Sequence, residues 1–257
     1  MKLDIPSIIN KHSNKSALIC GLGPSLQLYQ DKLEHIKKEN VIFACGEFYR
    51  FYKVIPDYWV QANNVTTVCN HINLIKNWIG CTIIYADTVE LTDKKWIDEN
   101  LKNDYIPYDQ RHFNGMTCNE LINSPLKNKG GYTYNGRCCN HIIKGRLTVQ
   151  EELQKISNYH KFYSTGSTVA LHAVAFAVIM GCNPIYITGV DLDYNLGYAK
   201  NDSNLQHGPV GELNNYTVEN VKDFEIINES AKKLNIKIYN LNPNSSFNVF
   251  EKGILNV

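Results

Sequence analysis

Short apolar runs alternate with longer amphipathic stretches along most of this 257-residue chain. The apolar runs are rich in β-branched residues and have the length of buried strands. They predict strands at Ala17–Cys20, Val41–Cys45, Tyr58–Ala62, Thr82–Ala86, Pro184–Thr188 and Lys237–Leu241. The stretches between them have helical periodicity, and several begin near Ser, Thr or Gly residues that are suited to cap a helix. They predict helices at Ser25–Lys38, Thr67–Ile79, Thr92–Leu101, Thr148–Asn158, Ser167–Met180 and Val218–Leu234.

This order predicts an α/β fold in a single domain spanning residues 1–257. Because the strands are almost continuously apolar, we expect a mainly parallel sheet covered by helices on both faces. Such sheets bind ligands at the carboxyl ends of their strands, near the point where the strand order reverses. The residues directly after each strand are therefore the candidates for a binding site.

Two segments interrupt the alternation. Residues 103–146 are polar and aromatic with no strong period, and they predict an irregular insert beside the site. Leu196–Tyr216 is similarly irregular and contains three glycines and a proline. A loop of this length inside a compact domain is usually functional, so we expect a lid.

Composition and charge exclude several classes of protein. The net charge of +1 lacks the basic excess of a general nucleic-acid-binding surface. No segment reaches the ~20 apolar residues that span a bilayer, and Met1–Ser16 contains no apolar signal core, so we expect a cytoplasmic location. Of the eight cysteines, Cys20, Cys45, Cys81 and Cys182 lie in or beside apolar runs and are expected to be reduced core residues. Zinc is not expected, because Cys138 and Cys139 lack a second pair at zinc-site spacing.

The first strand leads into the turn Gly21-Leu22-Gly23-Pro24-Ser25. Glycines allow close approach of the backbone to a phosphate, and free N–H groups at a helix start favour an anion. This placement predicts a nucleotide contact, although the third glycine of a dinucleotide motif and a Walker lysine are both absent. The alternative is a purely structural turn with Ser25 as the helix cap.

A second candidate anion or ribose contact lies where small polar residues open the apolar helix. These residues are Thr165, Gly166, Ser167 and Thr168. Simple capping of that helix by Ser167 or Thr168 is an equally good interpretation.

The strand at Pro184–Thr188 is followed by the densest polar cluster of the chain. Gly189 and Asp191 come directly after it, and Asp193, Tyr194 and Tyr198 follow. One interpretation is that Asp191 and Asp193 hold a divalent ion on a diphosphate. In the other, Asp191 hydrogen-bonds neighbouring loops while the tyrosines donate to a phosphate. In the predicted lid, His207 has the chemistry of a general base toward a sugar hydroxyl.

Three of these segments together resemble a known group of proteins. They are Gly21–Leu26, Gly166–Ala170 and Pro184–Tyr194, the last containing Gly-Val-Asp-Leu-Asp-Tyr. The series resembles the MptE-like group, which includes motility-associated-factor glycosyltransferases and pterin diphosphokinase-like proteins. It is also similar to bacterial lipooligosaccharide sialyltransferases of glycosyltransferase family 42, as is Lys237–Ser245. The resemblance does not cover the insert.

The resemblance implies a Rossmann-like transferase that moves a nonulosonic, sialic-acid-like sugar from a CMP donor with inversion. His207 corresponds to the lid histidine that deprotonates the acceptor hydroxyl. Tyr194 and Tyr198 correspond to the tyrosines that steady the leaving CMP phosphate, so no metal or other cofactor is required. From the MptE-like pattern, Asn63 or Asn64 contacts ribose. The implied partners are the nucleotide-sugar donor and a glycan or small-molecule acceptor, with peripheral membrane association and homo-oligomer formation left open.

The sequence also departs from the sialyltransferase pattern. Leu22 and Gly46 stand where those enzymes have asparagines that contact the nucleotide. Two alternatives therefore stay open beside the sialyltransferase-like function. One is a metal-dependent nucleotide-diphosphate enzyme, such as a pterin pyrophosphokinase-like protein, with Mg²⁺ on Asp191 and Asp193. The other is a non-catalytic nucleotide-binding module.

Overall fold

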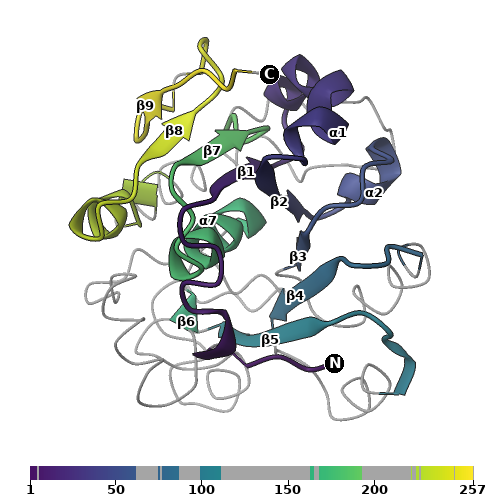
Figure 1. Ribbon diagram of the computed structural model, residues 1–257. Coiled ribbons are helices and arrows are strands. Elements are labelled where there is room, and N and C mark those ends of the chain that lie inside the picture. Colours follow the sequence, from purple (N-terminus) through teal and green to yellow (C-terminus); the bar gives the residue numbers. More distant parts are fainter. Residues whose placement is uncertain are drawn as a thin grey trace, which may run out of the picture.

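The computed structural model describes residues 1–4, 6–61, 75, 77–86, 99–110, 163–164, 168–192, 221, 224–225, 227–245 and 247–256. Within these residues a nine-stranded sheet has the order β6-β5-β4-β3-β2-β1-β7-β8-β9, and every strand pair is parallel (Figure 1). Its strands are β1 (Ser16–Cys20), β2 (Asn40–Cys45), β3 (Tyr58–Gln61), β4 (Thr82–Ala86), β5 (Tyr105–Gln110), β6 (Tyr163–Ser164), β7 (Ile185–Thr188), β8 (Ile238–Asn240) and β9 (Glu251–Lys252). The predicted α/β fold with a parallel sheet is confirmed, as is each of the six predicted strands.

The strand order reverses between β1 and β7. From β1 the chain builds the sheet outward through β2 to β6, and it then returns to place β7 on the other side of β1. Cys20 at the end of β1 pairs with Ala44 of β2 and with Thr188 of β7. The segments after these three strands therefore leave from the same edge of the sheet, at its switch point.

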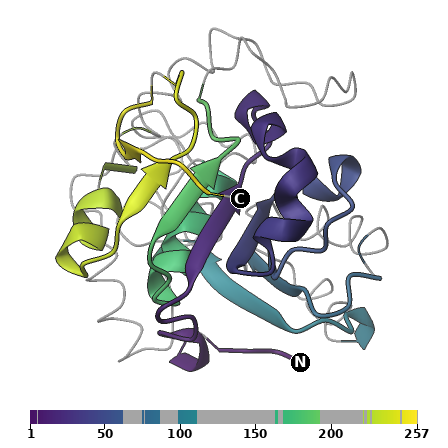
Figure 2. The same cartoon turned by 45° about the horizontal axis from the view of Figure 1, so that its top comes forward.

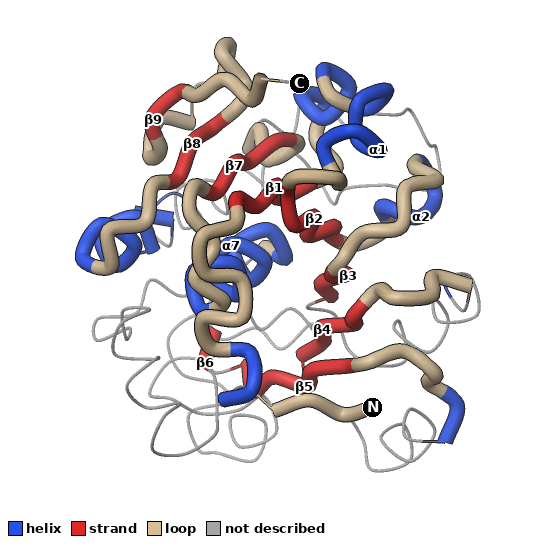
Figure 3. Tube along the Cα trace, in the orientation of Figure 1, coloured by secondary structure: helices blue, strands red, loops and turns tan. Residues whose placement is uncertain are grey.

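Helices cover the two faces of the sheet with alternating residues of the same strands. Helix α7 (Val169–Ile179) is buried on almost all sides and packs with Ala17 and Ile19 of β1. On the opposite face, α1 (Leu33–Ile36) and α2 (Phe48–Phe51) pack with Leu18 and Cys20 of the same strand. Figure 2 shows α1 in front of the strands, and Figure 3 shows the helices on either side of them. Successive residues of a strand point to opposite faces, and both faces are covered by helices. The strands are therefore apolar at nearly every position.

Three helix predictions fall mostly on described residues, while Thr67–Ile79 and Thr92–Leu101 are described only at a few positions. The predicted helix Ser167–Met180 is confirmed as α7, and residues 227–233 of Val218–Leu234 are helical. The prediction of one helix over Ser25–Lys38 is wrong. That stretch forms two 3₁₀ turns, η2 (Pro24–Leu28) and η3 (Gln30–Lys32), followed by the single turn of α1. Ser25 bonds this first turn to the segment after β7, because its N–H donates to Asp191 and its Oγ accepts from Gly189.

The insert differs from its prediction at its start. Residues 105–110 of the expected irregular segment form β5, which pairs with β4 at residues 105–108 and with β6 at residues 109–110. Pro107 lies within this strand. Because proline lacks the N–H that a strand donates to its neighbour, its presence argued against a strand in the sequence. Residues 111–146 of the insert, and the lid at residues 196–216, lie outside the described residues.

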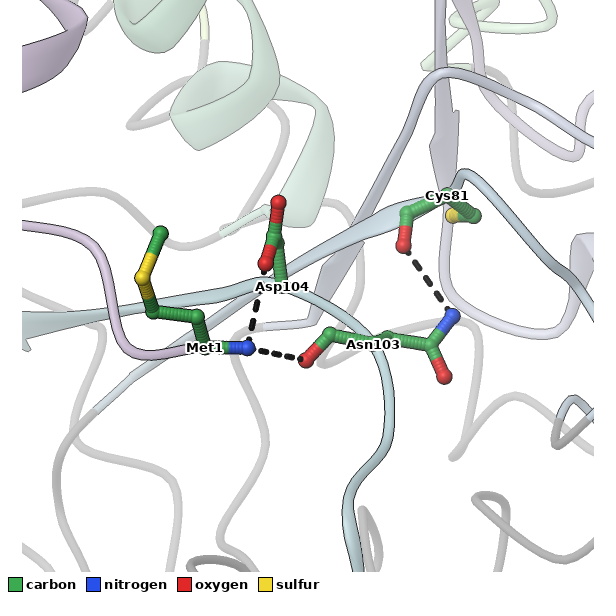
Figure 4. A network of polar contacts seen from close by, with 4 residues as sticks. All are labelled: Met1, Cys81, Asn103 and Asp104. Atoms are coloured by element: carbon green, nitrogen blue, oxygen red, sulfur yellow. Dashed lines mark hydrogen bonds and ion pairs between the residues drawn. The ribbon is translucent and has the colours of Figure 1, made fainter.

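The start of the chain lies along β5. The Leu3 N–H donates to the Tyr105 carbonyl at 2.8 Å, and the Tyr105 N–H donates to the Met1 carbonyl at 3.0 Å. The Met1 amino group contacts the Asn103 carbonyl at 3.2 Å and Oδ1 of Asp104 at 3.0 Å (Figure 4). Asn103 in turn donates to the Cys81 carbonyl at 3.1 Å. Because the ion pair is exposed, we expect the backbone bonds to contribute more to this docking than the charges do.

Candidate functional site

The turn after β1 closes directly on the turn after β7 at the switch point of the sheet. The Gly21 N–H donates to the Thr188 carbonyl at 2.8 Å. Two residues later, the Gly23 N–H donates to the Gly189 carbonyl at 2.7 Å. The glycine turn, residues 21–25, therefore continues the pairing of β1 and β7 beyond the sheet.

Glycine is required here because two backbones approach each other. A Cβ on Gly21 would lie 2.1 Å from the Gly189 carbonyl oxygen, and a Cβ on Gly23 would lie 2.4 Å from Oδ2 of Asp191. Gly189 itself has a φ of +69°, in the region that favours glycine. The sequence predicted a close approach of this turn to a phosphate. In the structure the neighbour that approaches these glycines is the turn after β7, and the phosphate contact stays a prediction.

Ser25 joins the two turns and does not cap a helix. Its Oγ accepts from the Gly189 N–H at 2.7 Å, and its own N–H donates to Oδ2 of Asp191 at 3.0 Å. Thr188 Oγ1 donates to the Ser25 carbonyl at 3.1 Å. The interpretation of Ser25 as the cap is wrong, since η2 begins without a side-chain capping bond. The N–H groups of residues 21, 23 and 25 all donate within the protein, so they differ from the free anion donors that the sequence suggested.

Asp191 is a buried anchor with both carboxylate oxygens engaged. Its side chain is 6% exposed. Oδ2 accepts from Ser25, and Oδ1 accepts from Nδ2 of Asn242 at 2.7 Å. The carboxylate thus connects the segments after β1, β7 and β8, as in the second interpretation of this residue. Within the described part of the chain, no group of three or more His, Cys, Asp and Glu side chains is placed to hold a metal ion.

Asn242 and Lys252 belong to this arrangement and are absent from the predicted site residues. Lys252 Nζ donates to the carbonyls of Asn242 at 3.0 Å and Ser245 at 2.9 Å. Partial burial lowers the pKa of Lys252, and the Asp191 charge opposes that shift. The Asn-Pro-Asn-Ser sequence after β8 was a signal for Asn242, because it belongs to the resemblance. Lys252 lies on a two-residue exposed strand and had no such signal.

The two departures from the sialyltransferase pattern meet in space. Gly46 follows β2 with a φ of +55°, and a Cβ there would lie 3.6 Å from Cδ1 of Leu22, an ordinary contact distance. The Gly46 carbonyl accepts from Nε1 of the buried Trp59 at 2.6 Å. Leu22 and Gly46 are thus neighbours just beyond the carboxyl ends of β1 and β2.

The remaining predicted site residues are only partly covered. Thr168 occupies the N-cap position of α7, but its side chain makes no capping hydrogen bond. The others lie outside the described residues: Asn63, Asn64, Thr165, Gly166, Ser167, Asp193, Tyr194, Tyr198 and His207. The structure therefore brings together Gly21, Gly23, Ser25, Gly189 and Asp191, with Leu22 beside them. The ligand-binding role of all these residues stays a prediction.

Comparison with solved structures finds the same fold in sugar transferases. The sialyltransferase CST-II of Campylobacter jejuni, solved with a trisaccharide acceptor and CMP, superposes with a TM-score of 0.50 at 16% identity, over 93% of this chain and 85% of that one. The MAf glycosyltransferase of Magnetospirillum magneticum AMB-1 gives a TM-score of 0.51 at 14% identity. The match covers 96% of this chain but only 34% of that longer protein. This chain shares their fold.

Comparison of the sequence with known families and proteins does not assign this chain to a family. Neither a protein-family model nor a curated protein matches this sequence. Among the described helices, none is both long enough and apolar enough to cross a membrane.

Proposed function

We propose that this protein is a glycosyltransferase that moves an acidic, sialic-acid-like sugar from a CMP donor to a glycan or other acceptor. The observation that carries the proposal is the closed pair of turns after β1 and β7 at the switch point, where α/β sheets bind ligands. The shared fold supports it, since one solved neighbour is a sialyltransferase with CMP and acceptor bound.

Asp191 precedes the proposed catalytic segment in the sequence. Its carboxylate is held by Ser25 and Asn242 after the end of β7, and Tyr194 and Tyr198 follow it by three and seven residues. We assign to these two tyrosines the donation of hydrogen bonds to the phosphate of the leaving CMP. Phenol donors stabilise the charge that develops as the bond between the sugar and the phosphate oxygen breaks. No metal is required in this scheme.

His207 is the proposed general base. It would take the proton of the acceptor hydroxyl as that oxygen attacks the anomeric carbon from the face opposite CMP, which inverts the configuration. The electron pair of the broken bond leaves with CMP. The adjacent Gly208 and Pro209 suit a loop that closes over the substrates.

The alternative metal-dependent function is less well supported. A metal on Asp191 and Asp193 would have to share the carboxylate that already accepts bonds from Ser25 and Asn242. Removing Asp191 from those bonds would leave a buried N–H and a side-chain amide without their acceptor, which costs about 1–3 kcal/mol for each.

A transfer assay with His207→Ala tests the proposal. The substrates are CMP-sialic acid and an oligosaccharide acceptor, with EDTA present, and His35→Ala at an exposed helical position is the matched control. We expect His207→Ala to lose about 10²–10⁴ in rate while CMP affinity stays unchanged. Near wild-type turnover by His207→Ala would refute the role of His207. Activity that appears only with added Mg²⁺ would refute the metal-free mechanism and favour the diphosphate alternative.

A further inference from the structure

Asn242 lies at the centre of the hydrogen bonds that join the loop after β8 to the glycine turn. Its main-chain N–H donates to Oδ1 of Asn240 at 2.9 Å, and its carbonyl accepts from Lys252 at 3.0 Å. The loop is held further by Nδ2 of Asn240, which donates to the Phe247 carbonyl at 3.1 Å. These bonds fix the main chain of Asn242 relative to β8 and β9.

The orientation of the Asn242 side chain is also determined. Its Oδ1 accepts from the Asn244 N–H at 3.0 Å, so this oxygen faces its own loop. The amide nitrogen is therefore turned toward Asp191 and donates to Oδ1 at 2.7 Å. A flipped amide would place an oxygen against the carboxylate and an NH₂ group against the Asn244 N–H. Both of these contacts would be repulsive.

The same carboxylate sets the glycine turn. Oδ2 of Asp191 accepts from the Ser25 N–H at 3.0 Å and lies where a Cβ on Gly23 would be, 2.4 Å away. A rotation of the carboxylate would therefore release Ser25 or collide with the turn backbone. Asn242 opposes that rotation from the other side of the carboxylate.

We propose that Asn242 is a positioning residue for the nucleotide: it orients Asp191, and through Asp191 it holds the glycine turn in the form that binds the donor. The inference rests on the proposed function for the identity of the ligand. It assigns a role in the site to the loop after β8, which is distant from the glycine turn in sequence.

Two substitutions separate positioning from mere loss of a contact. Asn242→Ala removes the donor and leaves the carboxylate free to turn. Asn242→Asp places a second carboxylate about 2.7 Å from the first, so that repulsion disrupts the bridge while both are ionised. Close carboxylates share a proton as the pH falls, and the protonated group then donates to the other. Asn242→Asp should therefore recover in acid.

Asn244→Ala is the matched control. Asn244 is the same residue type in the same loop, its side chain is exposed, and its contact with Asn242 is through the main chain, which alanine retains.

The experiment measures the Kd of CMP by calorimetry for wild type and the three variants at about pH 8 and pH 5.5, with melting curves at both. For Asn242→Ala we expect about a tenfold weaker Kd, equivalent to ~1.4 kcal/mol, and for Asn244→Ala no change. Asn242→Asp should bind more weakly still at pH 8 and recover at pH 5.5 relative to wild type. Wild-type affinity in both Asn242 variants would overturn the inference, as would a loss in Asn242→Asp that does not depend on pH. If Asn242→Asp does not fold, the inference is judged by comparing the Kd of Asn242→Ala with that of Asn244→Ala, and equal values would overturn it.

Failure of the proposed function has a different signature. If wild-type protein does not bind CMP, the proposed donor is wrong, and hydrogen exchange decides the positioning claim instead. Faster exchange of the Gly23 and Ser25 amides in Asn242→Ala than in Asn244→Ala would support it, and equal exchange would overturn it.

Discussion

Substitution of Gly21 by alanine tests whether the two turns at the switch point are packed backbone to backbone. The added Cβ would lie 2.1 Å from the Gly189 carbonyl oxygen, 2.7 Å from its carbonyl carbon and 2.9 Å from Cγ2 of Val190. Two of these atoms belong to the backbone of a central strand's turn, so they cannot move aside as a flexible side chain would. Relief requires the two turns to separate, which strains their hydrogen bonds at 2.7 and 2.8 Å.

We estimate the destabilisation at about 3 kcal/mol, the upper part of the range for overpacking, because the clash is with main-chain atoms. For a chain of this length that corresponds to a drop of about 6–12 °C in Tm. Gly80→Ala is the matched control. A Cβ on Gly80 meets nothing within 4 Å, but its φ of +86° makes alanine strained. We expect that variant to lose only about 1 kcal/mol, the cost of a Cβ in the left-handed conformation.

Urea unfolding and thermal melts of both variants supply the measurement. The predicted order of stability is wild type, then Gly80→Ala, then Gly21→Ala. The opposite outcomes are that Gly21→Ala melts within about 2 °C of wild type, or that the two variants are equally destabilised. Either result would mean that the turns after β1 and β7 are not in contact as described.

Two further predictions concern stability. Burial, and secondarily the charges of Lys11 and Lys15, lower the pKa of His12, with Asp57 opposing. The folded state therefore binds the proton less readily than the unfolded state. The free energy of unfolding is unaffected by this histidine above pH 6.5 and decreases as the pH falls below 6.5, because the unfolded state is protonated first. Replacing His12 with glutamine should flatten the pH dependence of urea unfolding in that window, and an unchanged slope would contradict it. In addition, replacing Trp59 with phenylalanine removes the donor to the Gly46 carbonyl and should cost about 2 kcal/mol in urea unfolding. A loss no larger than that of a Trp78-to-phenylalanine control would show that this bond contributes nothing.

The sheet was predictable because its strands obey a local rule. Strands buried on both faces are continuous apolar runs, and the run at Ala17–Cys20 is an example, with residues on two opposite cores. β5 was not predicted, because Pro107 and the polar residues near it do not form the apolar run that is typical of a buried strand. The 3₁₀ turns in place of one helix over Ser25–Lys38 were not predicted either, because the spacing of apolar residues in this short stretch does not separate a 3₁₀ turn from an α-helical one.

The site could be predicted from the sequence only where glycines indicate a tight turn of the main chain. The glycines of the turn after β1 indicated a tight turn with a close neighbour, but the neighbour expected from the sequence was a phosphate, whereas the structure shows the Gly189 turn there. The role of Ser25 could not be predicted, because its partners lie more than 160 residues away in sequence. Asn242 reaches Asp191 over 51 residues, and such a bond leaves no periodic pattern in either segment.

Calorimetry with CMP, UDP, GDP and ATP, each with Mg²⁺ and with EDTA, tests whether the donor is a CMP-sugar bound without metal. We predict that CMP binds preferentially and that EDTA leaves its Kd unchanged. A ligand at a hundred times its Kd should also stabilise the fold by ~2.7 kcal/mol, which a parallel melt detects. Binding of a di- or triphosphate that requires Mg²⁺, or no binding of any nucleotide, would contradict the proposed function.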